Sequence, residues 1–107
     1  MIMAYFYLIL AILFEVTGTI LLPVSKNFTK IIPTICLSIS YILAFYFLTF
    51  PMKSLPIAIV YGTWCGLGIL CISILSYLVY DQTLQWQSIV GLFFIIIGVI
   101  VVNLFAT

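Results

Sequence analysis

Four long apolar runs separated by short polar breaks dominate the pattern of this chain. The runs cover about residues 5–22, 32–50, 57–80 and 86–105. Each is close to the roughly 20 residues that an α-helix needs to cross the hydrocarbon core of a bilayer. The first two breaks contain proline and lysine, and the third contains Asp81 and Gln82; such residues commonly end a helix. The pattern predicts an all-α membrane protein with four transmembrane helices in a single transmembrane domain, residues 1–107.

The breaks are too short to hold another domain, and short loops make consecutive helices antiparallel neighbours. Both termini are therefore expected on one side of the membrane, together with Lys53. Lys26 and Lys30 are expected on the other side, so the positive-inside rule favours one orientation by a single lysine. With so small a bias, we expect insertion in both orientations, which would permit an antiparallel homodimer. The apolar start, residues 1–13, lacks a basic leader and a cleavage site, so we expect it to be retained as helix.

Composition excludes several classes of function. The chain is 67% hydrophobic and 5% charged, too apolar for a soluble domain, and its net charge of +1 gives no basic cluster for nucleic acid. It contains no histidine and no arginine, so no His-based metal site or hydrolase triad is expected. Cys36, Cys65 and Cys71 lie in apolar runs without a CxxC pair and are expected to be free thiols. We predict neither an enzyme nor a bound cofactor or metal.

Glu15 is the one carboxylate near the middle of an apolar run. Insertion scales put a central Asp, Lys or Arg at about +2.5 to +3.5 kcal/mol, and a glutamate should be comparable. No lysine lies within an apolar run, so an internal salt bridge is not expected. Burial favours the protonated carboxyl and a bound cation favours the ionised one, which makes Glu15 a candidate proton and cation exchange site. The alternative is a permanently protonated side chain that bridges helices by hydrogen bonds.

Small and aromatic side chains accompany the carboxylate at helical spacing. Ala11, Gly18 and Thr19 share its face of the first helix, where small residues either let a neighbouring backbone approach or leave room for a ligand. In the second helix Tyr41 and Phe45 share a face, and the tyrosine hydroxyl is expected to reach a carboxylate. Packing between helices is the alternative for both.

The third helix carries Tyr61, Trp64 and Gly68 on one face, with Gly66 close by. Aromatic rings attract organic cations by roughly 0.5 to 2 kcal/mol, although an aromatic stripe in a membrane helix also serves for packing. Gly66 and Gly68 would let the helix bend, or would let another helix pack closely.

The fourth helix has no ionisable side chain, and Gly91 and Gly98 lie seven residues apart in register on one face. Four short helices do not easily enclose both a substrate chamber and two alternating exits. A dimer interface along this helix is therefore expected.

These residues together resemble a known family. The segment with Glu15, Gly18 and Thr19, the stretch NFTKIIPT, the run LPIAIVYGTWCGLGI and the closing GLFFIIIGVIVVN are similar to the bacterial small multidrug resistance family, most of all its EmrE-type exporters. The resemblance covers nearly the whole chain. Its most specific elements are the central glutamate of the first helix and the pattern Tyr61, Trp64, Gly66 and Gly68 in the third.

The resemblance implies a proton-coupled antiporter in the bacterial plasma (inner) membrane that exports lipophilic or quaternary ammonium cations. It implies an antiparallel homodimer in which the glutamates of both protomers share one site. The positions that match substrate-lining residues are Tyr41, Phe45, Tyr61 and Trp64, and those that match the dimer contact are Gly91 and Gly98.

The chain departs from the family pattern at Leu22 and Pro23, where many members have a lysine, and at Asn27, where a glycine often precedes FT. These changes argue against a role for a loop cation in substrate entry, and they leave the central site untouched. The pair Gly18 and Thr19 favours the multidrug branch. The alternatives are a guanidinium or polyamine exporter of the same family, or a small subunit that does not transport.

Overall fold

The computed structural model describes residues 2–105. Within them lie four long α-helices and one short 3-10 helix: α1 (Ile2–Leu21), α2 (Ile31–Leu48), η1 (Pro51–Lys53), α3 (Ile57–Tyr80) and α4 (Trp86–Leu104). These residues contain no β-strand. All four α-helices are long and apolar enough to cross a membrane, so the predicted all-α protein with four transmembrane helices is confirmed.

The helix ends differ from the expected ones by a few residues. α1 begins at Ile2 rather than near Tyr5, because no breaking residue interrupts the helical hydrogen bonds between them. α2 ends at Leu48 rather than at Phe50, because Pro51 lacks a backbone N–H and the chain turns there into η1. α3 ends where Asp81 takes a left-handed conformation with φ 55°.

The connection between α1 and α2 is a tight turn held together by one buried serine. Three consecutive residues, Lys26, Asn27 and Phe28, have positive φ values of 50°, 59° and 67°. Ser25 is only 1% exposed. Its hydroxyl donates to the carbonyl of Leu22 at 2.7 Å and accepts from the backbone N–H of Phe28 at 3.2 Å. These bonds satisfy polar groups of the turn that would otherwise be left unpaired.

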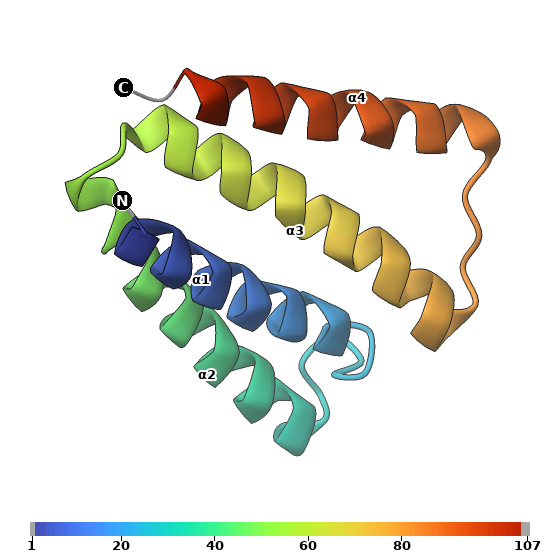
Figure 1. Ribbon diagram of the computed structural model, residues 1–107. Coiled ribbons are helices and arrows are strands. Elements are labelled where there is room, and N and C mark those ends of the chain that lie inside the picture. The colour runs from blue at the N-terminus through green and yellow to red at the C-terminus, as the bar shows by residue number, and fades with distance from the viewer. Residues whose placement is uncertain (1, 106–107) are drawn as a thin grey trace.

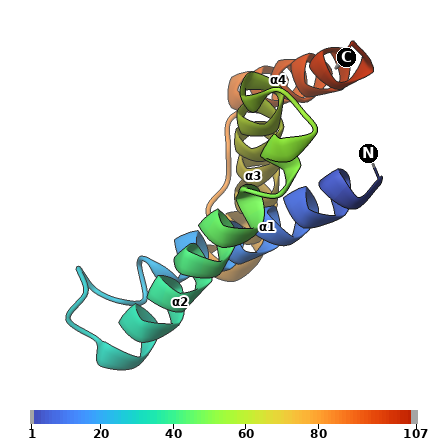
Figure 2. The same ribbon diagram turned by 90° about the vertical axis from the view of Figure 1, so that its left-hand side faces the viewer.

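The helices form one bent layer in the order α2, α1, α3, α4 (Figure 1, Figure 2). The described part of the chain measures 44 × 35 × 17 Å. Because a helix with its side chains is about 10 to 12 Å wide, the shortest dimension leaves no room for a second full layer. A single copy therefore forms an open slab and not a closed four-helix bundle.

The core lies between α1, α2, η1 and the start of α3. It is built from small and branched apolar side chains: Ala4, Leu8, Ala11, Ile12, Val16, Leu48, Leu55 and Val60. By contrast, Val99 is the one buried residue of α4. The large apolar side chains of α4, including Phe93 and Phe94 at 67% exposed each, cover a surface suited to lipid or to another protein.

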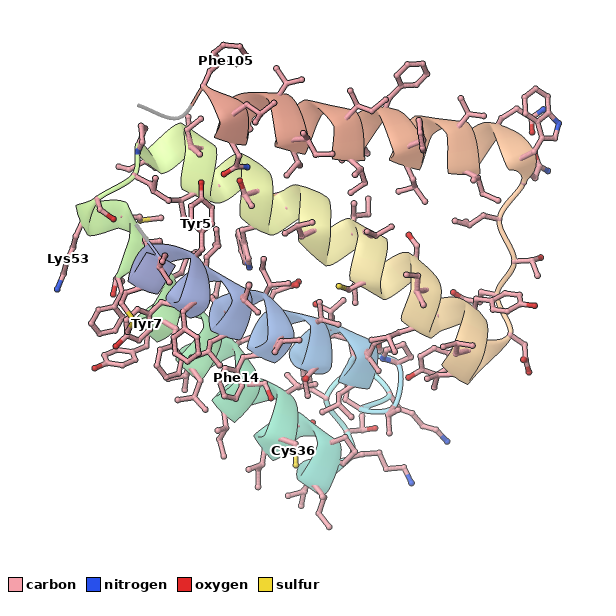
Figure 3. All side chains as sticks on the ribbon, viewed as in Figure 1. Tyr5, Tyr7, Phe14, Cys36, Lys53 and Phe105 are labelled. Atoms are coloured by element: carbon pink, nitrogen blue, oxygen red, sulfur yellow. The ribbon has the colours of Figure 1, made fainter. Side chains whose placement is uncertain are left out.

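α1 begins on the same side of the layer on which α4 ends, as expected for an even number of antiparallel spans (Figure 1). Lys53 lies at this side, in η1 (Figure 3). Lys26 and Lys30 lie at the opposite end, in the turn that leads into α2. The lysines are thus divided two against one between the ends of the helices.

Candidate functional site

Glu15 lies past the middle of α1, on the side that faces α2 and α3. It is half-buried. None of the lysines lies within a long helix, so no cationic side chain of the chain shares its depth. The cost of keeping a carboxyl group there must be met by hydrogen bonds, by protonation or by a cation from outside the chain.

Three side chains form a hydrogen-bond chain from α1 to α2, which we call the Glu15 cluster. Thr19 Oγ1 donates to Glu15 Oε1 at 2.8 Å and also lies 2.8 Å from the Tyr41 hydroxyl. A threonine has a single hydroxyl proton, so once it goes to an ionised carboxylate, Tyr41 must be the donor to Thr19. The Tyr41 hydroxyl is therefore linked to the carboxylate indirectly, through Thr19.

The two carboxylate oxygens of Glu15 have different surroundings. Oε1 ends the hydrogen-bond chain, whereas Oε2 has no hydrogen-bond partner within residues 2–105. A Cβ atom at Gly68 would lie 3.2 Å from Oε2, so the glycine lets the backbone of α3 come close to the carboxylate. Oε2 is therefore the oxygen free to take a proton or to face a cation.

A pocket of about 270 Å³ opens between α1 and α3 beside the carboxylate. Its lining residues are Glu15, Trp64, Cys65, Gly68, Ile69 and Ile72. Pockets for drug-sized ligands usually measure about 300 to 1,000 Å³, so this one is small for such a ligand. It contains one carboxyl group in an otherwise apolar and aromatic surface, which suits an apolar cation.

Trp64 forms an aromatic wall of the pocket. Phe45 meets its ring edge-on at a centroid distance of 5.8 Å, and Tyr61 lies at 5.7 Å. Both neighbours are more than half exposed and flank the pocket without lining it. The indole N–H of Trp64 is buried and has no hydrogen-bond partner within residues 2–105. This donor is available to a ligand or to a second copy of the chain.

The small residues of α1 have separate roles. A Cβ at Gly18 would lie 3.2 Å from the ring of Tyr41, so the glycine lets that ring lie against α1. Ala11 is fully buried and belongs to the apolar core. Its small side chain therefore serves helix packing and does not leave room for a ligand. Gly18 thus supports the Glu15 cluster, while Ala11 supports the helix packing beneath it.

The glycines of α3 and α4 also differ from one another. A Cβ at Gly66 would overlap Cγ2 of Val99, so Gly66 permits close packing of α3 on α4. Gly68 instead faces the carboxylate. Gly91 and Gly98 have no atom within 4 Å of an added Cβ, so the stripe that they form on α4 has space beside it within this chain.

Some residues in and near the site were not singled out from the sequence. Cys65, Ile69 and Ile72 line the pocket because they lie beside Trp64 and Gly68 on α3. Asn103 forms a second hydrogen-bond cluster on α4. Its signal in the sequence is an amide at the end of a long apolar run in α4, where a polar group needs partners.

The chain is similar to proteins of one family along nearly all of its length. Residues 3–95 match the family described as Small Multidrug Resistance protein. The chain is 40% identical over 105 residues to the quaternary ammonium compound-resistance protein QacH of Staphylococcus saprophyticus, with 98% of each protein covered. It is 39% identical over 100 residues to QacE of Escherichia coli, covering 94% of this chain and 91% of the relative. It is also 39% identical over 102 residues to a multidrug transporter of Pseudomonas aeruginosa, covering 95% and 93%.

Proposed function

This chain belongs to the small multidrug resistance family, and from that premise we propose that it is a proton-coupled antiporter that exports lipophilic and quaternary ammonium cations. It is a multi-pass bacterial membrane protein. In this role the protein acts as a transporter of the plasma (inner) membrane and not as an enzyme. Quaternary ammonium resistance and multidrug transport in the names of its relatives support the substrate class.

The observation that carries this proposal is the asymmetry of the Glu15 carboxylate. Oε1 is held by Thr19, while Oε2 is unpartnered and lies close to Gly68 beside a pocket with an aromatic wall. One carboxylate oxygen is thus fixed in orientation and the other is left for exchange. A carboxyl group that served only to bridge helices would have both oxygens paired, because an unpaired polar group in an apolar environment costs free energy.

Coupling follows from competition at this oxygen. A cation stabilises the ionised carboxylate and displaces a proton, whereas a proton neutralises the carboxylate and releases the cation. An inward proton gradient then drives outward transport of the cation. By reciprocity, acidification weakens cation binding by the same factor by which the cation promotes proton release.

The transporting unit in this proposal is an antiparallel homodimer. The slab formed by one chain is 17 Å thick and its pocket measures about 270 Å³, so a second copy would complete an enclosed site. Gly91 and Gly98 leave space along α4 for a partner helix. The single-lysine bias supports insertion in both orientations. A reporter at the C-terminus that is found on one side only in every molecule would exclude a homodimer of this kind.

The test of the proposed function measures binding of tetraphenylphosphonium by purified protein across a range of pH. Wild type should bind more weakly as the pH falls and should release protons when the cation is added. Glu15→Gln keeps a hydrogen-bonding side chain, so it should fold and yet lose both responses. If the affinity of Glu15→Gln still depends on pH, another group is titrating and the role assigned to Glu15 fails.

Transport into proteoliposomes under a pH gradient tests the substrate class. A quaternary ammonium and a planar aromatic cation should be exchanged for protons, and guanidinium should compete poorly. Preference for guanidinium or a polyamine would assign the chain to another branch of the family. A protein that neither binds tetraphenylphosphonium nor moves protons would fit a non-transporting subunit.

A further inference from the structure

Asn103 joins three of the four long helices through its side-chain amide. Its Oδ1 accepts a hydrogen bond from the Tyr5 hydroxyl of α1 at 2.7 Å. Its Nδ2 donates to Thr63 Oγ1 of α3 and to the carbonyl of Val99, one turn earlier in α4, at 2.8 Å each. We call Asn103, Tyr5 and Thr63 the Asn103 cluster. The Tyr5 side chain extends from α1 toward α3 and α4 (Figure 3).

The orientation of this amide is fixed by its partners. A backbone carbonyl only accepts hydrogen bonds, so the nitrogen must face Val99, and the oxygen is left to accept from Tyr5. Both N–H groups of the amide are then used. Thr63 is 3% exposed, so water would not readily replace Asn103 as the donor to its hydroxyl oxygen.

The cluster lies at one end of the contact between α3 and α4. Thr63 and Gly66 lie on one face of α3, opposite Asn103 and Val99 of α4. Toward the connection at residues 81–85, α4 diverges from α3 (Figure 1). The polar contact therefore lies at the end where α4 is held close to the rest of the chain.

α3 presents a second face to the carboxylate. Thr63 directly precedes Trp64, and Gly68 lies one turn further along, so Trp64 and Gly68 face the pocket beside Glu15. A rotation of α3 that broke the contact of Thr63 with Asn103 would also turn Trp64 and Gly68 away from the carboxylate, because all three residues belong to the same continuous helix.

We propose that Asn103 is a positioning residue for the Glu15 site. By holding Thr63 against α4 and Tyr5 of α1, it fixes the rotation of α3 that directs Trp64 and Gly68 toward the carboxylate. Asn103 contacts neither the carboxylate nor the pocket beside it. This inference rests on the proposed function for its effect on cation binding, while its effect on the environment of Trp64 is independent of that function.

The experiment compares four variants in a Trp86→Phe background, which leaves Trp64 as the sole tryptophan. Thr63→Val removes the hydroxyl at nearly constant shape, and Thr63→Ser restores it. Thr17→Val is the matched control, because the Thr17 hydroxyl donates only to the carbonyl of Leu13, within α1, at 2.8 Å. Tetraphenylphosphonium affinity and quenching of Trp64 fluorescence by acrylamide are measured at fixed pH.

Thr63→Val should weaken binding by roughly 3- to 18-fold, which corresponds to the average and the largest free energies measured for intramembrane hydrogen bonds. It should also make Trp64 more accessible to acrylamide, while Thr63→Ser and Thr17→Val stay within twofold of the parent. Tyr5→Phe breaks the other arm of the Asn103 cluster and should change both measurements in the same direction. It provides the test if Thr63→Val does not fold.

Unchanged affinity and unchanged quenching in a folded Thr63→Val protein would overturn the inference. The same holds for a variant that is only less thermally stable, since that would give Asn103 a structural role alone. If the parent protein binds no tetraphenylphosphonium, the proposed function fails. The quenching measurement then still decides whether Asn103 sets the orientation of Trp64.

Discussion

Two clusters of three hydrogen-bonded side chains lie within the membrane-spanning part of this chain, and they differ in what they leave unsatisfied. The Glu15 cluster joins α1 to α2 and keeps one carboxylate oxygen unpartnered beside a pocket. The Asn103 cluster joins α1, α3 and α4, and its amide has a partner for its oxygen and for both N–H groups. Both lie where an unpaired polar group is costly.

This difference supports the proposed role of Glu15 as a site for exchange and of Asn103 as a link between helices. A neutral amide with all its groups paired gains nothing from a passing ion, so the Asn103 cluster contributes by holding helices together. A carboxyl group with one oxygen free can gain a new partner there without losing its hydrogen bond to Thr19. Tyr5 and Glu15 are ten residues apart on α1, about 15 Å along the helix axis, so one helix carries both clusters.

The largest effect on cation binding is expected from Gly68→Ala, which tests whether the free oxygen of Glu15 faces the cation. Its added Cβ would lie 3.2 Å from the free oxygen and would occupy the space through which a cation approaches. Close charge pairs are coupled by about 1.5 kcal/mol or more, so we expect tetraphenylphosphonium affinity to fall by about 10-fold or more. Equilibrium binding to the purified protein measures this loss.

Gly62→Ala is the matched control, because no atom lies within 4 Å of a Cβ added there. It should bind as wild type does. A glycine needed only for bending of α3 would give a different result for Gly68→Ala, namely slower transport with unchanged equilibrium affinity. That outcome would remove the assignment of Oε2 as the exchanging oxygen.

Replacing the aromatic wall should have a smaller effect. Trp64→Ala removes a ring whose interaction with a cation contributes about 0.5 to 2 kcal/mol, so affinity for tetraphenylphosphonium should fall roughly 2- to 30-fold. Trp64→Phe should lose less, since a ring remains. Trp86→Ala changes an exposed tryptophan at the start of α4 and serves as the control in the same binding assay.

If Trp64→Ala binds as tightly as wild type in a folded protein, the pocket does not recognise cations through this ring. Tyr61→Phe should be milder than Trp64→Ala. The Tyr61 ring lies beside Trp64, and its side chain does not line the pocket.

The sequence predicted the spans and the central residue of the site because each has a simple physical signal. Apolar runs of about 20 residues separated by proline and charge specify spanning helices, and one carboxylate within a run stands out on cost alone. Helical spacing also brought Thr19 and Gly68 into consideration. The pairing of each oxygen of Glu15 depends on how α1, α2 and α3 approach one another, and no pattern within a single helix contains that information.

The Asn103 cluster also depends on contacts between helices that no pattern within a single helix predicts. Tyr5 is typical of an aromatic anchor at a helix end, and its partner lies 98 residues away in the sequence. Thr63 and Gly66 look alike as small residues of α3. Their common role in packing on α4 follows only from the crossing of the two helices.

The smallest expected effect concerns the far end of the Glu15 cluster. Tyr41→Phe keeps the ring that packs on Gly18 and removes the hydroxyl that donates to Thr19. Thr19 can still give its proton to Glu15 Oε1, so the carboxylate remains held by one bond and the free oxygen is unchanged. We therefore expect tetraphenylphosphonium affinity to fall only about threefold, the average effect of one intramembrane hydrogen bond. Tyr46→Phe, on the same helix and 58% exposed, is the control.

Thr19→Val should lower tetraphenylphosphonium affinity more than Tyr41→Phe does, because it removes the hydrogen bond to the carboxylate itself. The double variant should bind only slightly more weakly than Thr19→Val alone. Binding measured for the two single variants and the double variant gives the coupling between the hydroxyl groups. Fully additive losses would mean that Tyr41 acts on the cation directly and not through Thr19.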